Sequence, residues 1–235
     1  MPDKIQIAAR PFPFPLISEL RTDNTALVIV DMQIDFCAEG GMMAAHGLDL
    51  SYVRTVIEPI RRVLDVARKT GMHIIHTRVG NAPDLSDLNA VKQARQEAFG
   101  SRVGGSGRSI DRSARYLIRG EPSWNIIPEL KPNPGELIID KPGYDAFYAT
   151  DMHTQLKKRG IENLVLTGVA TDCCVTSTLR QAAEHGYDCL VLADCCACMR
   201  PEPHHRTIEL LEMGSMFGTV AKSETFIDHI QRLDA

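Results

Sequence analysis

The chain of 235 residues lacks any apolar run long enough to cross a bilayer, and its first residues, MPDKIQIAARPFPFPL, contain no apolar core of signal-peptide length. It also lacks a large excess of one charge, since 26 basic residues oppose 30 acidic ones and leave a net charge of -4. Nothing therefore points to nucleic acid or to an anionic membrane surface. We expect a cytoplasmic protein with neither nucleic-acid nor membrane partners.

A complete metal-binding pattern is missing as well. The stretch CCAC at 195–198 contains one C-x-x-C, but no second C-x-x-C or paired-histidine segment is placed to complete a zinc site. A thioredoxin-like thiol pair would open a helix, whereas RPEP follows these cysteines. His204 and His205, near the start of an expected helix, are interpreted as solvated. We expect no metal and no cofactor, and we interpret the 7 cysteines as reduced thiols because no secretory signal precedes them.

What the chain does contain is a regular alternation of short apolar runs and amphipathic stretches. The apolar runs predict buried strands at 26–31, 73–77, 136–140, 163–168, 189–194 and, more weakly, 218–222. The amphipathic stretches predict helices near 55–69, 151–160, 172–185, 203–213 and 223–232, the third of them ending at Gly186. Such alternation is typical of an α/β fold, here with three αβα layers and a mostly parallel six-stranded sheet. With 44% hydrophobic residues, residues 1–235 are expected to form a single domain.

Two segments fall outside this alternation. Pro-Phe-Pro-Phe-Pro at 11–15 cannot be helical, because each proline removes a donor and restricts its neighbour, so residues 1–23 are predicted to be an extended arm. The region 80–124 has no strong period and includes GSRVGGSGRS. So long a stretch is interpreted as a functional lid, a subunit contact or a locally mobile loop.

The predicted strand ends bring together residues with useful chemistry. In parallel sheets, ligands bind beyond the carboxyl ends of the strands. Asp31 ends the first predicted strand, Lys141 follows the third, and the turn from Thr171 to Cys174 follows the fourth. Alone, such an aspartate could cap a loop and such a lysine could be solvated. An acid, an amine and a thiol at one sheet edge instead favour a functional site.

The turn contains two adjacent cysteines, and helical periodicity separates them. If Thr171 or Asp172 caps the helix, the apolar stripe facing the sheet consists of Val175, Leu179, Ala182 and Ala183. Cys173 then falls on the solvated face, and Cys174 lies next to the stripe in the first turn, where unpaired N–H groups favour a thiolate. The periodicity favours Cys174 as a nucleophile. The alternative, a cysteine that merely packs as a small hydrophobe, stays open at this point.

Three segments, TALVIVDMQIDF, IIDKPGYDAF and GVATDCCVTSTLRQAAEHGY, resemble the signature segments of the isochorismatase-like cysteine hydrolases. The resemblance covers nearly all of the chain after the arm, with the segments in the expected order. It implies a catalytic triad of Asp31, Lys141 and Cys174, with Cys173 at a variable position. It also implies a cis peptide between Val169 and Ala170.

Within this superfamily the chain most resembles the biuret and triuret hydrolases, on the segments HTR, PDLSDL, RGEPSWNIIPEL, DKPG and ADCC. Ureidoacrylate amidohydrolases are the next most similar, through the pattern around Lys141 and Tyr144. Biuret hydrolases tend to have a second lysine at the position of Tyr144 and a glutamine near the segment LEMGSMFG. The resemblance therefore implies a metal-independent amidohydrolase acting on a small linear ureide such as biuret or triuret, with ureidoacrylate as the alternative substrate.

The remaining expectations concern the pocket and the assembly. The N–H groups of Ala170 and Cys174 are predicted to bind an oxyanion. Phe36, Arg78, Tyr144 and Phe147 are candidate substrate-binding residues, with core packing or an ion pair as the alternative for each. The presence of the thiol argues against a vinyl-ether hydrolase like isochorismatase itself, and the intact triad argues against a non-enzymatic interaction protein. The resemblance also implies a homo-oligomer, most commonly a tetramer.

Overall fold

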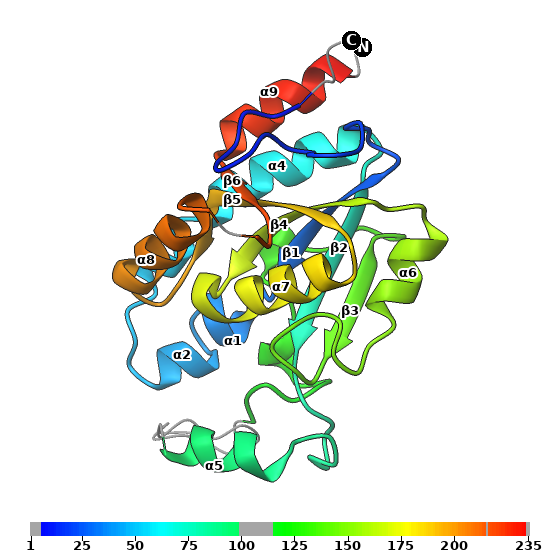
Figure 1. Ribbon diagram of the computed structural model, residues 1–235. Coiled ribbons are helices and arrows are strands. Elements are labelled where there is room, and N and C mark those ends of the chain that lie inside the picture. The colour runs from blue at the N-terminus through cyan, green and yellow to red at the C-terminus, as the bar shows by residue number, and fades with distance from the viewer. Residues whose placement is uncertain (1–5, 99–114, 215, 234–235) are drawn as a thin grey trace.

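The computed structural model describes residues 6–98, 115–214 and 216–233. The segment GSRVGGSGRS therefore lies outside the described residues. Six parallel strands form one sheet in the order β3-β2-β1-β4-β5-β6 (Figure 1). Their bounds are β1 Thr25–Val30, β2 His73–Val79, β3 Leu137–Lys141, β4 Asn163–Val169, β5 Asp188–Ala197 and β6 Thr219–Ala221. The predicted α/β architecture is confirmed.

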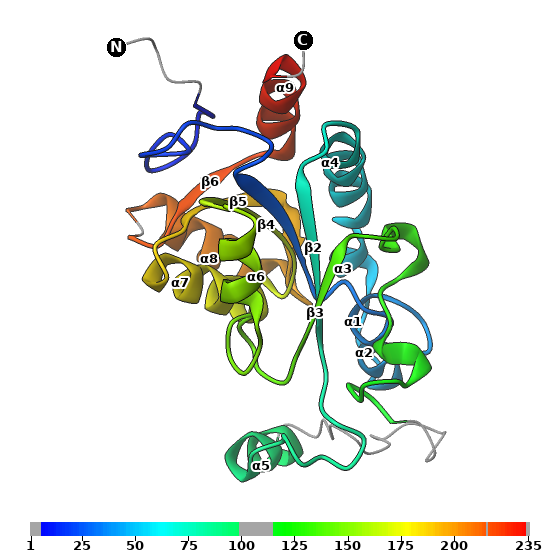
Figure 2. The same ribbon diagram turned by 90° about the vertical axis from the view of Figure 1, so that its right-hand side faces the viewer.

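Helices cover both faces of the sheet, which Figure 2 shows nearly edge-on. Leu27 and Ile29 of β1 pack into one core cluster with α4 (Ile57–Lys69) and α9 (Ser223–Leu233). Ala26, Val28 and Val30 enter the other cluster with α6 (Met152–Lys158), α7 (Thr176–Glu184) and α8 (Pro201–Glu212). Because both faces are covered, every residue of β1 is buried, which explains its continuous apolar sequence.

Some boundaries differ from those predicted. Strand β2 extends two residues past 77, so Arg78 lies inside the strand, and β5 extends to Ala197 through an irregular register beside β4. The helices α1 (Ile34–Cys37), α2 (Met42–Ala45), α3 (Ser51–Arg54) and α5 (Ala90–Ala98) were not predicted. Nor were the short 3-10 turns η1 (Pro122–Trp124) and η2 (Pro128–Leu130). Elements this short span too few turns to show a hydrophobic period.

The helix predicted at 172–185 begins differently from the expectation. A π-helical turn, η3 (Thr171–Val175), precedes α7, and the N–H of Val175 donates to the carbonyl of Ala170 at 3.1 Å. No side chain caps the turn, so the predicted capping by Thr171 or Asp172 was wrong. The predicted apolar stripe is confirmed for Val175, Leu179 and Ala182, which are fully buried. Gly186 follows the helix with a φ of 82°, as expected for a C-terminal glycine.

The arm runs along β6 and α9 (Figure 1). Isolated antiparallel bridges join Ile7 to Phe14 and Arg10 to Val220, and the side chains of Ile7 and Phe14 are fully buried. The arm therefore packs on the body of its own chain. Among the described residues, no helix is long and apolar enough to cross a membrane.

Candidate active site

Two charged side chains meet at the carboxyl edge of the sheet. Asp31 directly follows β1, and Lys141 is the last residue of β3, with β2 between them. The Nζ atom of Lys141 lies 2.7 Å from Oδ2 of Asp31, and both side chains are 0% exposed. From β2, Thr77 Oγ1 donates a hydrogen bond to Asp31 Oδ1 at 2.6 Å. The sheet thus holds a sealed ion pair at the place where the sequence predicted an acid and an amine.

The ammonium group of Lys141 has a complete set of acceptors. Besides the ion pair, Nζ donates to the carbonyls of Gly143 at 3.1 Å and Tyr144 at 2.8 Å, which accounts for its three N–H bonds. Burial lowers the pKa of Lys141, but interaction with the Asp31 carboxylate, followed by interaction with Cys174, outweighs burial and raises it overall. Lys141 is therefore a fixed cation. Asp31 Oδ2 has no hydrogen-bond donor beyond this ion pair in the described chain, so it keeps room to accept a proton.

Cys174 lies in the π-helical turn and interacts electrostatically with both members of the ion pair. Its side chain is 6% exposed and packs in the core cluster beneath α7. The thiol of Cys174 donates a hydrogen bond to Cys173; this hydrogen bond, followed by burial, raises the pKa of Cys174, and it lowers the pKa of Cys173. Cys174 is thus a neutral thiol in the resting site and must lose its proton during any reaction. The expectation of a solvated Cys173 was wrong, because this residue packs partly buried against the same cluster.

Neighbouring elements brace this turn. Thr171 Oγ1 hydrogen-bonds Nδ1 of His204 at 2.9 Å, and His204 is 7% exposed, so the expectation that it is solvated was wrong. The thiol of Cys198 donates to Asp172 Oδ1 at 3.0 Å, and burial raises its pKa to about 12. Cys195 and Cys196 are buried in β5, and burial raises their pKa values, so the C-x-x-C of Cys195 and Cys198 consists of one packing thiol and one thiol that is hydrogen-bonded to Asp172. The cis peptide between Val169 and Ala170 is present.

The four candidate substrate-binding residues have different surroundings. Arg78 pairs with Asp140 through Nε and Nη2 at 2.8 and 3.0 Å and stacks 3.7 Å over Trp124. The ring of Phe147 packs 4.9 Å from that of His185, and Phe36 packs against two core clusters. These three fit the packing and ion-pair alternatives. Tyr144 is 46% exposed beside Lys141, which leaves its ring available to a ligand.

Three residues near the site were missed by sequence reasoning. Thr77 could have been found from the parallel register, which sets β2 beside β1. Gln33 donates to the carbonyls of Val79 and Trp124 at 3.0 and 2.8 Å, and it accepts from the Val79 N–H at 2.8 Å. It thereby ties the end of β1 to its neighbours. Lys92, from α5, lies over the loop that follows Lys141, and nothing in the aperiodic stretch around it indicated this position.

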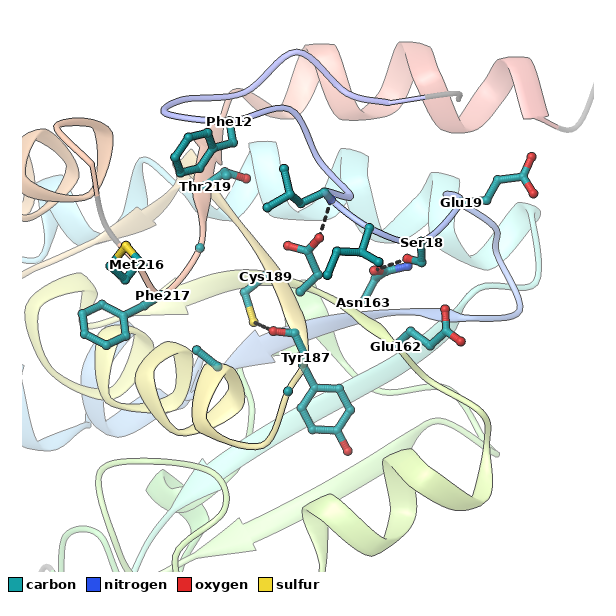
Figure 3. A pocket seen from close by; sticks show the side chains of 16 residues that line it. Phe12, Ser18, Glu19, Glu162, Asn163, Tyr187, Cys189, Met216, Phe217 and Thr219 are labelled. Atoms are coloured by element: carbon teal, nitrogen blue, oxygen red, sulfur yellow. Dashed lines mark hydrogen bonds between the residues drawn. The ribbon is translucent and has the colours of Figure 1, made fainter. Parts of the chain in front are cut away.

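A cavity of about 720 Å³ lies elsewhere, under the arm (Figure 3). Its lining includes Phe12, Ile17, Asn163, Asp188 and Phe217. Asn163 and Asp188 begin β4 and β5, so this cavity is at the amino edge of the sheet, opposite the ion pair. It is therefore not the site formed by Asp31, Lys141 and Cys174. Within the described part of the chain, no group of three or more His, Cys, Asp or Glu side chains is arranged to hold a metal ion.

The chain is similar to proteins of known family. The model of the isochorismatase domain matches residues 25–225. The ureidoacrylate amidohydrolase RutB of Stutzerimonas stutzeri is 31% identical over 95% of this chain and 88% of its own length. A cysteine hydrolase from Pseudomonas syringae shares the fold with a TM-score of 0.75 and 22% identity, covering 91% of this chain and 95% of that one. The N-carbamoylsarcosine amidase of Thermoplasma acidophilum has a TM-score of 0.63 at 23% identity, over 86% and 97% of the two chains.

The two solved structures share the overall fold described above. The predicted superfamily is confirmed at the level of sequence as well, because the domain match and the long alignment to RutB cover the same residues that surround the ion pair and the thiol. The chain belongs to the isochorismatase family of hydrolases.

Proposed function

We propose that this protein is a cysteine-dependent amidohydrolase that cleaves a C–N bond of a small linear ureide. The observation that supports this most directly is the buried Lys141–Asp31 pair, at 2.7 Å, whose two charges act on the buried Cys174 thiol. Biuret and triuret are the substrates that the sequence resemblance favours. Ureidoacrylate is the second candidate, because relatives described as ureidoacrylate amidohydrolases are 31% and 29% identical over more than nine-tenths of the chain.

The chemistry requires a strong nucleophile, since both nitrogens of a urea-type carbonyl donate electrons into it. In the proposed first step, Asp31 Oδ2 takes the proton of the Cys174 thiol while the sulfur attacks the carbonyl carbon. Lys141 keeps the carboxylate in place and stabilises the developing thiolate. This division of roles follows from the contacts, because the ammonium of Lys141 has three acceptors already and its pKa is raised.

The tetrahedral intermediate then collapses. The N–H groups of Ala170 and Cys174, at the start of the π-helical turn, stabilise the oxyanion. Protonated Asp31 returns its proton to the departing nitrogen as the C–N bond breaks, which leaves a thioester on Cys174. Water, activated by Asp31, hydrolyses the thioester and restores the thiol. Every proton removed is returned, so the cycle needs no cofactor.

The proposal is tested by ammonia release from biuret, triuret, ureidoacrylate and nicotinamide. We expect turnover of at least one ureide and none of nicotinamide. Cys174→Ser should lower kcat by more than about 10³-fold, because the thiolate nucleophile is gone, and Asp31→Asn by about 10²- to 10⁴-fold. Cys173→Ser is the matched control and should keep kcat within a few-fold. A folded protein that is silent on all ureides, or a Cys174→Ser variant with normal turnover, would refute the proposal.

A further inference from the structure

Helix α5 places an amine beside the candidate site. The Nζ atom of Lys92 donates a hydrogen bond to the carbonyl of Pro142 at 2.5 Å and lies 5.1 Å from the centroid of the Tyr144 ring. Lys141 hydrogen-bonds the carbonyls of Gly143 and Tyr144 in the same loop. The two lysines therefore hold consecutive residues of one loop, although they come from segments about fifty positions apart.

The position of Lys92 is well supported by its own segment. Asn89 Oδ1 accepts the backbone N–H of Lys92 at 2.8 Å and so caps the first turn of α5. Just before the helix, Leu85 and Leu88 pack against the cluster of Val79, Leu117 and Ile118. The Lys92 side chain is thus held at its backbone by a helix whose preceding segment packs against β2, and at its amine by the carbonyl of Pro142.

The ammonium group of Lys92 has N–H donors available for a ligand. Within residues 6–98, 115–214 and 216–233, one of its three N–H bonds is directed at Pro142, which leaves two for another acceptor. Burial, followed by repulsion from Lys141, lowers its pKa. The acid that acts on it, Asp87, is 2.8 Å from Arg119 and is engaged there.

We propose that Lys92 is a substrate-binding residue that holds an acceptor oxygen at the end of the substrate remote from the attacked carbonyl. This inference rests on the proposed function. The acceptor is a second carbonyl in a neutral ureide such as biuret or triuret, or a carboxylate in a ureido acid. Hydrogen bonds between two charged groups are stronger than those to a neutral carbonyl, so a carboxylate would be bound more tightly.

The first test separates binding from chemistry. Lys92→Met should raise KM about 10- to 100-fold for the ureide that is turned over and leave kcat within a few-fold, because the residue contacts the remote end of the substrate. Lys92→Arg keeps the charge and should recover part of the loss. Arg95→Met is the matched control, since it removes the same charge from the same helix without that contact. Selective loss for ureidoacrylate identifies a carboxylate, and loss for biuret or triuret identifies a carbonyl.

The second test needs no turnover. In a Cys173→Ala background, the rate of Cys174 alkylation is measured with iodoacetate and with iodoacetamide, two reagents that differ in a carboxylate. The rate with iodoacetate divided by the rate with iodoacetamide should fall about 10-fold in the Lys92→Met variant and change little in the Arg95→Met variant. An unchanged ratio, equal effects of the two substitutions, or an unchanged KM overturns the role of Lys92. If no ureide is turned over but Lys92→Met still lowers the ratio of iodoacetate to iodoacetamide rates, the proposed function is contradicted, whereas anion binding by Lys92 is supported.

Discussion

At the scale of single residues, Cys173 and Cys174 show how neighbours in sequence acquire different chemistry. Their thiols share a hydrogen bond that raises the pKa of Cys174 and lowers the pKa of Cys173. Two adjacent thiols do not both ionise readily, because like charges repel. The pKa of the Cys174 thiol, which must lose its proton in the proposed reaction, therefore depends on Cys173, a residue that takes no part in the reaction.

Removing the neighbour should change the titration of the nucleophile. In Cys173→Ala, the hydrogen bond that raises the pKa of Cys174 is lost, so that pKa should fall. Since the thiolate is the reactive form, the curve of alkylation rate against pH should move to lower pH. Iodoacetamide labelling of the Cys174 peptide, followed by mass spectrometry, measures the midpoint. Cys189→Ala, at a remote buried thiol, should leave the midpoint where it is in the wild type. A midpoint that stays or rises in Cys173→Ala would contradict the assignment.

The ion pair should behave as a unit in stability measurements. Asp31→Asn leaves the buried ammonium of Lys141 without its carboxylate, and we expect a loss of about 3–5 kcal/mol in the free energy of unfolding. Lys141→Met should cost a similar amount for the converse reason. The double variant should lose clearly less than the sum of the two, because neither charge is then left alone. Urea unfolding gives all three values, with Glu58→Gln in an exposed pair as the control at less than about 1 kcal/mol. Strict additivity would argue against coupling.

At the scale of elements, the site depends on how closely β4 approaches β1. Gly168 has a φ of 104°, and a Cβ atom there would lie 2.1 Å from the carbonyl oxygen of Val30. Val30 precedes Asp31, and Gly168 precedes the cis peptide, so this contact sets the distance between the acid and the π-helical turn. No larger residue fits without separating the two strands.

Gly168→Ala should therefore destabilise the protein by about 3 kcal/mol or more and lower activity together with it. Gly160→Ala is the matched control, since Gly160 also has a positive φ, 68°, but no atom within 4 Å of its Cβ position. It should cost about 1 kcal/mol for the backbone conformation alone. Thermal or urea unfolding of the two variants measures the difference. Equal losses would show that the contact with Val30 does not matter.

At the scale of the whole molecule, the sequence predicted the features that depend on a local pattern, and it did not predict the contacts between elements distant in sequence. Buried parallel strands are recognisable because their apolar runs are continuous, and the strand ends then place Asp31 and Lys141 at one edge. The partner of Arg78 needs the register that sets it opposite Asp140, which no local pattern contains. The burial of His204 needs the packing of α8 on the π-helical turn, and the position of Lys92 needs a helix in a stretch without a period.

The assembly is a prediction at this scale that stays to be measured. We expect a homotetramer in solution, as the resemblance to the superfamily implies. Light scattering coupled to size exclusion should give about four times the chain mass of 26.0 kDa. The mass should not change over a tenfold range of protein concentration. A mass of one chain throughout that range would remove the prediction.

The complete enclosure of Lys141 has a practical consequence for covalent labelling. Amine-acylating reagents react with the uncharged, accessible form of a lysine, and Lys141 is 0% exposed with a raised pKa. Lys92 is half-buried with a lowered pKa, so it meets both requirements better. Inhibition by such a reagent at low modification levels would thus indicate acylation of Lys92 on α5, while Lys141 stays unmodified. Acylation can therefore address the two amines separately.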